Sequence, residues 1–287
     1  MSKLHERRVG LIAAIVLVVI LVGAIILGLN HQRSQAQETD SLQTVKTTHV
    51  MRWGVKSDTR LFGLISPKTG QSEGFDVDIA RAITAQIAKQ TGTKIKPEFT
   101  PVTTSSKIQL LKNHQVDAVA ASMTITPERA KVVDFSTPYF PAGQSLLVKR
   151  DSPVKNIRDL NRPDATIIGV MGTTALETTK QFAPQAKVIA MPDNSQAFSA
   201  LQSGQGDAMT TDNAILYGFS SQSPNVQVVG GTFTNQPYGL AVDKGQTQLQ
   251  HEVDQALGTI RQNGTYERLI KKWFGNIPGL DWRELLK

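Results

Sequence analysis

Hydroxyl side chains followed by an arginine make VAASMTITPER the stretch of this chain most suggestive of chemistry. Ser122 and Thr124 end an apolar run, and Thr126 is followed by proline and glutamate. That order is typical of a helix start, because threonine caps free amide groups and proline loses no donor there. Arg129 then lies in the first turn, where the helix dipole disfavours a cation. A bound carboxylate would supply a partner, and the alternative is an exposed arginine that pairs with Asp134 or is solvated.

Asp212, in TTDNAILYGF, is the second candidate, because its carboxylate could hold the ammonium group of a ligand. The alternative is a helix cap, since aspartate is favoured just before a helix. Thr173 and Thr174 follow GVMG, where hydroxyls either donate to a ligand or cap the next helix. An arginine from one part of the chain and an aspartate from another could therefore hold a carboxylate and an ammonium group of a ligand.

Three residues of an early loop and one lysine of TTSSK complete the candidates. They are Lys56, Asp58, Phe62 and Lys107. Both lysines lie near the end of a strand or the start of a helix, and solvation is their alternative role. Turn formation is the alternative for the aspartate, and core packing is the alternative for the phenylalanine.

Composition excludes several other kinds of site. The chain has no cysteine, which excludes disulfides, thiolate metal sites and a cysteine nucleophile. Its five histidines are scattered without the spacing of metal ligands, so we expect no metal and no cofactor. The formal charge is +7, but the positive residues are not interleaved with aromatics as in a nucleic-acid groove. We therefore expect no nucleic-acid partner.

The elements that must position these side chains alternate between strand and helix. HVMRWGV at 49–55 is strand-like, and Ile79, Ile83 and Ile87 follow at helical spacing. VDAVAA at 116–121 is the next buried strand, and the alternation restarts at ATIIGVM. Such alternation predicts an α/β protein with largely parallel sheets.

The restart of the pattern predicts two lobes. We expect one lobe from residues 48–141 plus 238–287 and a second from 142–237, joined by hinge crossings at 138–149 and 232–244. Ligands of open parallel sheets bind outside the carboxyl ends of the strands. The candidates of both lobes would therefore meet in one cleft suited to a small polar ligand.

The N-terminus contains an uninterrupted apolar run at residues 9–29, preceded by three basic residues. Twenty-one helical residues span about 31 Å, the thickness of a bilayer core. We expect residues 1–30 to form a cytoplasmic tip with a membrane anchor, and 31–47 to form a flexible tether. Cleavage near Ala36 is the alternative, and it would give a secreted or periplasmic protein. Both place the remaining chain outside the cytoplasm.

Four segments together resemble the polar amino-acid solute-binding proteins of ABC importers. The segments are EGFDVDIARAI, QVDAVAASMTITPERAKVVDFSTPYF, PYGLAVDKG and IRQNGTYERLIKKWFG, and the likeness covers roughly 49–276. It implies the two-lobed periplasmic-binding-protein fold (type II), each lobe a mainly parallel sheet with helices on both faces, here preceded by one N-terminal transmembrane helix. It also implies a monomer that delivers one amino acid to the membrane subunits of an ABC permease at the extracytoplasmic face.

The resemblance assigns roles to the candidates in the cleft. It implies that Arg129 and Thr124 hold the α-carboxylate of the ligand, aided by Ser122, and that Asp212 holds its α-ammonium group. The two threonines of GVMGTT would be further contacts, although this segment is one residue shorter than in many relatives. These contacts are common to every amino acid and so define the class of ligand only.

The resemblance leaves two hypotheses open for the identity of the ligand. Lys56 and Lys107 match positions that meet the side-chain carboxylate in relatives that bind acidic amino acids, which favours glutamate or aspartate. Asp58 matches a side-chain contact of glutamine binders, which favours glutamine. Phe62, or its neighbour Leu61, would cover the ligand.

Two other functions are alternatives to transport. One is an amino-acid sensor or accessory binding protein. The other is an exported dehydratase of the same fold, which would need a general acid or base in the cleft. No histidine maps near the cleft, and Asp58 would be the only obvious candidate. We therefore expect a binding protein rather than an enzyme.

Overall fold

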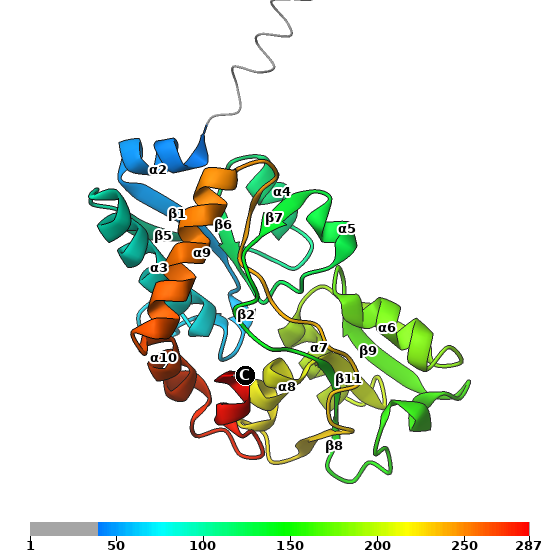
Figure 1. Cartoon of the computed structure of the whole chain (residues 1–287). Coiled ribbons are helices and arrows are strands. Elements are labelled where there is room, and N and C mark those ends of the chain that lie inside the picture. The colour runs from blue at the N-terminus through cyan, green and yellow to red at the C-terminus, as the bar shows by residue number, and fades with distance from the viewer. Residues whose placement is uncertain (1–39, 287) are drawn as a thin grey trace, which may run out of the picture.

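The computed structural model describes residues 40–286 (Figure 1). The expected anchor at 9–29 and the cleavage site near Ala36 lie outside these described residues. Within 40–286, no helix combines the length and apolar character needed to cross a membrane.

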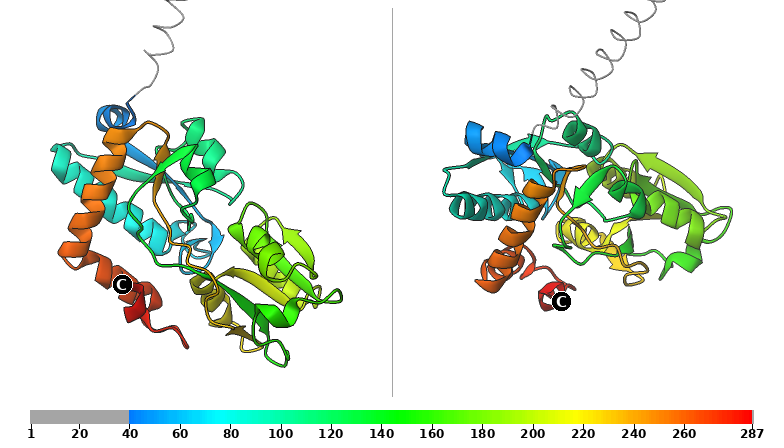
Figure 2. Two further views of the ribbon diagram at one scale, coloured as in Figure 1. Left: turned by 45° about the vertical axis from the view of Figure 1, so that its right-hand side comes forward. Right: turned by 45° about the horizontal axis from the view of Figure 1, so that its top comes forward.

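Two five-stranded sheets form the centres of two lobes (Figures 1 and 2). We call the part built on the sheet with β1 the first lobe and the part built on the sheet with β9 the second lobe. The first sheet has the order β5 (Lys96–Pro101), β1 (Val50–Val55), β6 (Ala118–Ala120), β13 (Ala241–Asp243), β7 (Val133–Phe135). The second has the order β10 (Lys187–Met191), β9 (Thr166–Val170), β11 (Ala208–Asp212), β8 (Gln144–Lys149), β12 (Val226–Val229).

Each sheet is mixed, with one strand running against the other four. β13 pairs antiparallel with β6 and β7, and β8 pairs antiparallel with β11 and β12. These two strands are the ones that the chain enters directly from a crossing between the lobes. No helix precedes them to return the chain to its starting edge, which a parallel neighbour would require.

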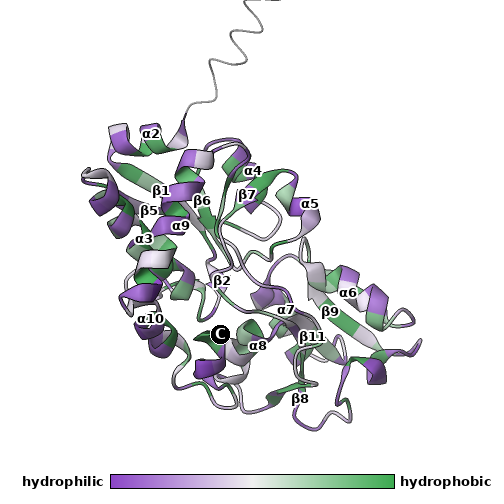
Figure 3. Ribbon diagram, in the orientation of Figure 1, coloured by the Kyte–Doolittle hydropathy of each residue, from purple (hydrophilic) through white to green (hydrophobic). Residues whose placement is uncertain are grey.

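Helices flank both sheets and turn hydrophilic residues outward, as α6 and α9 show in Figure 3. Those of the first lobe are α2 (Ser41–Thr48), α3 (Phe75–Thr91), α4 (Lys107–Lys112), α5 (Pro127–Ala130), α9 (Thr247–Gln262) and α10 (Thr265–Phe274). Those of the second lobe are η1 (Ile157–Leu160), α6 (Thr174–Phe182), α7 (Asn194–Gln202) and α8 (Asn213–Ser220). The remaining elements are β2 (Asp58–Thr59), β3 (Gly63–Ile65), β4 (Ser72–Glu73) and η2 (Trp282–Leu286).

Helix α3 shows why the sequence folds as expected in the first lobe. Ile79, Ile83 and Ile87 are fully buried, and burying each contributes about 1.5–3 kcal/mol. Asp76 lies in the first turn, at the positive end of the helix dipole. The helix ends at Gly92, whose φ of 65° is left-handed and costs glycine little.

The expected tether at 31–47 is wrong for its last residues, because Ser41–Thr48 forms helix α2. Asp40 caps this helix through its carboxylate, which accepts from two backbone N–H groups. Leu42 and Val45 are buried where α2 packs against α9 and β1. The polar residues between them mask this short apolar face in the sequence, so the segment reads as a linker.

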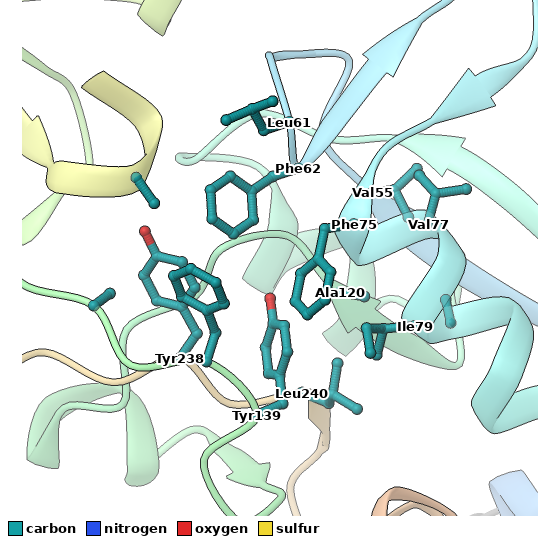
Figure 4. Packing of buried hydrophobic residues seen from close by; sticks show 14 of the residues in the cluster. Val55, Leu61, Phe62, Phe75, Val77, Ile79, Ala120, Tyr139, Tyr238 and Leu240 are labelled. Carbon is teal, nitrogen blue, oxygen red and sulfur yellow. The ribbon is translucent and has the colours of Figure 1, made fainter. Parts of the chain in front are cut away.

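Two chain segments cross side by side between the lobes, one green and one orange in Figure 1. Tyr139 donates its backbone N–H to the carbonyl of Tyr238 at 2.8 Å, and Gln236 donates to Ala142 at 2.7 Å. The crossings rest on a cluster of aromatic rings (Figure 4), in which the Phe62 ring lies 5.7 Å from that of Tyr238. The crossings are therefore a paired connection supported by the core.

Candidate functional site

A polar cleft between the lobes holds about 400 Å³ of space that protein atoms do not fill. The first lobe contributes Lys56, Thr59, Thr104, Lys107, Ala121, Ser122, Thr124 and Arg129. The second lobe contributes Gln144, Thr173, Thr174, Ala175, Asn194, Thr211, Asp212 and Ile215. Eight of the ten residues expected from the sequence are in these two sets.

Arg129 is held at the cleft by the start of α5. Thr126 accepts the backbone N–H of Arg129 at 3.2 Å, as expected of a helix cap. The guanidinium donates to the carbonyl of Thr124 at 2.8 Å and, across the cleft, to the carbonyl of Gly172 at 3.1 Å. A guanidinium has five N–H donors, so three stay unused by the described residues. The alternative pairing with Asp134 is excluded, because that carboxylate bonds Lys244 instead.

Asp212 lies at the second-lobe side of the cleft, at the end of β11. It precedes α8, but its carboxylate makes no capping bond, so the helix-cap alternative fails. Its carboxylate instead accepts the hydroxyl of Tyr238 from the hinge crossing. Burial raises the pKa of Asp212 from 3.8 to about 6, although the Tyr238 hydroxyl and the cations of the cleft oppose the rise. A ligand ammonium group would restore the charged form.

The hydroxyl candidates differ in how free they are. The Thr124 hydroxyl has no partner among residues 40–286, so it is available to a ligand. Ser122 has the left-handed φ of 44°, and its hydroxyl donates to Asp76 at 3.0 Å. Thr173 donates to the carbonyl of Val170 at 2.6 Å. All three side chains line the cleft, but of these three only Thr124 has a hydroxyl without a partner in the described residues.

Lys107 and Lys56 both line the cleft and are almost completely buried. Lys107 donates to the carbonyl of Ala121 at 3.0 Å. Burial and the positive charges of Arg129 and Lys56 hold the pKa of Lys107 well below its usual 10.5. Lys56 forms an ion pair of 2.8 Å with Asp58.

Two expected ligand contacts do not line the cleft. Asp58 pairs with Lys56 and connects the lobes, since it accepts the backbone N–H of Asn194 at 3.0 Å. Phe62 is fully buried, with its ring 5.0 Å from that of Phe140 and 5.4 Å from that of Phe274. The expectation that Phe62 covers the ligand is therefore wrong, and core packing, its alternative role, is what the structure shows.

Each cation of the cleft has a carboxyl group nearby. Lys56 pairs with Asp58, and the Asp212 carboxylate opposes the effect of burial on the pKa of Arg129. The third cation, Lys107, has Asp76 nearby, whose charge raises the pKa of the lysine. Burial raises the pKa of Asp76 to about 6, against hydrogen bonds from Tyr139 and Ser122. Glu177 adds a further carboxylate that acts on Arg129, so each of the three cations has at least one carboxyl group nearby.

Several lining residues were missed in the sequence, and Gln144 and Asn194 are the most informative. Gln144 is paired with Asp212 in the β8–β11 register, so both side chains stand on the same face of the sheet. Asn194 begins α7 and donates its side-chain amide to Thr59 of the first lobe at 3.0 Å. Gln144 could have been recognised as a candidate because it is a polar residue in an apolar strand. Nothing in the sequence around Asn194 marks it as a site residue.

These features define a class: a two-lobed protein with a hinge and a small cleft that offers a cation and a carboxylate to a zwitterion. The sequence profile of bacterial extracellular solute-binding proteins, family 3, matches residues 51–276. The chain belongs to this family. Membership implies a small amino-acid ligand, an extracytoplasmic location and a partner permease of an ABC transporter.

Similar proteins support the same class. The ABC transporter glutamine-binding protein GlnH of Bacillus subtilis is 44% identical over 251 residues, which is 88% of this chain and 90% of that protein. The glutamine-binding protein of Geobacillus stearothermophilus is 43% identical, over 72% of this chain and 77% of that one. The crystal structure of AncCDT-1, an ancestral amino acid-binding protein and precursor of cyclohexadienyl dehydratase, has a TM-score of 0.74 at 36% identity, over 81% of this chain and 98% of that one.

The comparisons confirm the predicted family, the two-lobed α/β fold and a binding protein rather than an enzyme. The residue roles in the cleft stay predictions.

Proposed function

We propose that this protein captures glutamine in the cleft between its lobes and delivers it to an ABC permease. The observation that carries the proposal is that one cleft contains both the unused Arg129 donors of the first lobe and the Asp212 carboxylate of the second lobe. A ligand carboxylate would take the donors, aided by the free Thr124 hydroxyl, and a ligand ammonium group would take the acceptor. Because the two groups come from different lobes, binding stabilises the closed form.

Charge balance favours a ligand with a neutral side chain. Each cation of the cleft already has a carboxyl group nearby, so a zwitterion such as glutamine adds no net charge. Glutamate would bring one more buried negative charge without a free cation to match it, which is costly. The two relatives named as glutamine-binding proteins support the same choice.

Calorimetry on residues 37–287 tests this proposal with glutamine, glutamate, aspartate and arginine as ligands. We expect glutamine to bind at least about tenfold more tightly than the others, because only it matches both charge and hydrogen-bonding groups. A protein that binds glutamate as tightly as glutamine would refute the charge argument. A protein that binds none of the four would refute the proposal as a whole.

We also propose that the apolar run at 9–29 anchors the protein as a monomer at the extracytoplasmic face of the membrane. A spanning helix holds a protein more firmly than a single acyl chain does. Carbonate extraction of membranes tests this: the full chain should stay in the pellet, and a chain without residues 1–30 should be released. Recovery of the full-length chain in the soluble fraction would contradict the anchor.

A further inference from the structure

Two buried side-chain oxygens of residues that line the cleft lack hydrogen-bond donors in the described structure. They are Oε1 of Gln144 and Oδ1 of Asn194, whose residues are 1% and 3% exposed. Buried acceptors are costly when unpaired, so native proteins leave few of them. Both residues line the cleft, and a ligand with N–H groups would satisfy them.

The orientation of the Asn194 amide is fixed by its neighbours. The Asp58 carboxylate can only accept, so the Thr59 hydroxyl donates to it at 3.1 Å. The Thr59 oxygen is then free to accept from the amide nitrogen of Asn194, which lies 3.0 Å away. The nitrogen of Asn194 is therefore occupied, and its oxygen is the atom left open.

The two open oxygens serve different parts of the cleft. Gln144 stands opposite Asp212 in the β8–β11 register, at the place proposed for the ammonium group. Its nitrogen is occupied by Thr174 and Gln236, both at 2.9 Å. Asn194 instead belongs with Thr59 and Asp58, on the side of Lys56.

We infer that Asn194 determines specificity, because its Oδ1 accepts a hydrogen bond from the side-chain amide N–H of the ligand. This rests on the proposed function, and it goes further by naming the atom that distinguishes an amide from a carboxylate. Glutamine and glutamate have nearly the same shape, but only glutamine carries a side-chain donor. Glutamate would place an oxygen against the Asn194 oxygen and leave it unpaired.

Charge and hydrogen bonding can be separated by a third ligand. The γ-methyl ester of glutamate is neutral in its side chain, like glutamine, but has no side-chain N–H. Calorimetry should show the wild-type protein binding this ester about tenfold more weakly than glutamine, the usual effect of one lost hydrogen bond in a buried site. Equal affinities for the two ligands would overturn the inference.

Asn194→Leu is the matching protein variant, because leucine keeps the volume and removes the acceptor. We expect the affinity of this variant for glutamine to fall until it agrees with its affinity for the ester within about threefold. Asn194→Ala should give the same convergence, which guards against a misfit of leucine. A variant that keeps the preference for glutamine would overturn the inference.

One control variant separates the Asn194 oxygen from other effects. Gln144→Ala removes the open oxygen beside Asp212. It should weaken glutamine and the ester by similar factors, since it leaves the Asn194 acceptor in place. If Gln144→Ala abolished the discrimination as Asn194→Leu does, a general loss of polar groups in the cleft would be responsible and not the Asn194 oxygen. A wild-type protein that binds neither ligand would instead refute the proposed function.

Discussion

At the scale of single residues, the charged groups that line the cleft are largely withdrawn from solvent but only partly hydrogen-bonded. Arg129 has donors to spare beyond its bonds to Thr124 and Gly172. Asp212 has one hydroxyl donor and a pKa raised to about 6 by burial. Groups in this state gain more from a ligand than exposed groups would, because water does not compete for them.

Arg129→Lys should weaken glutamine binding by about tenfold to a hundredfold, because lysine keeps the charge but loses the fork that matches a carboxylate. Calorimetry measures the change in affinity. Lys131→Ala is the matched control, since it removes an exposed cation two residues along and should leave the affinity unchanged. An Arg129→Lys protein with wild-type affinity would show that the carboxylate binds elsewhere.

The affinity for glutamine should fall as the pH drops below about 6. The ammonium group needs the charged form of Asp212, and the raised pKa removes that form tenfold per pH unit below about 6. Calorimetry from pH 5 to 8 gives the profile, and an affinity that is flat across this range would contradict it. Tyr238→Phe should move the fall to higher pH, because the lost hydroxyl is one of the groups that hold the pKa down.

The stability of the ligand-free protein should respond to pH with the opposite sign. The pKa of Asp212 is raised in the folded state, so the folded protein binds the proton more tightly than the unfolded chain does. The contribution of this group to the free energy of unfolding is therefore full below pH 3.8 and is lost as the pH rises through about 6.

At the scale of elements, helix α2 shows a limit of what the sequence discloses. The strands and long helices were predictable because their buried residues recur at regular spacing, as in α3. A helix of eight residues with two buried apolar side chains gives no such pattern, and it was expected to be a tether. Its stability comes from packing on α9, which only the folded chain supplies.

Removal of residues 1–48 should lower the thermal midpoint by several degrees relative to removal of residues 1–39. The longer deletion loses the burial of Leu42 and Val45 and the bond from the Ser41 N–H to Gln246. Those losses amount to about 3.5–7.5 kcal/mol, and they are offset in part because the deletion also removes the entropy cost of ordering these residues. Thermal unfolding by circular dichroism compares the two proteins, and equal midpoints would show that α2 contributes nothing.

The site was predictable to the extent that its residues stand in recognisable motifs. Arg129, Thr124 and Asp212 were expected and do line the cleft. Phe62 was misplaced because an aromatic residue after a strand can face either a ligand or the core, and only the ring cluster decides. Asn194 was missed because its role depends on Thr59 and Asp58, which lie more than a hundred residues earlier.

At the scale of the whole molecule, the largest of the three buried apolar clusters among the described residues spans both lobes, and the other two lie within one lobe each. A single cluster of buried apolar residues includes Val55 of the first sheet and Ile168 of the second, linked through Phe140 and Tyr238 of the crossings. The lobes should therefore unfold together rather than one after the other.

Glutamine at a hundred times its dissociation constant should stabilise this unit by about 2.7 kcal/mol. We expect one calorimetric transition, shifted upward by several degrees, with the same ligand having no effect on Asp212→Ala. Two separate transitions, with only one of them shifted by the ligand, would contradict a shared core.

The packing of α2 against the first lobe has a mechanical consequence. Anything that restrains the chain ahead of Asp40 acts on the first lobe alone, through the contact between α2 and α9. In the proposed closure, the second lobe moves relative to this held first lobe, and it carries Asp212 and Asn194 with it. Ligand capture then moves only the second lobe, and a docking permease would detect the position of the second lobe.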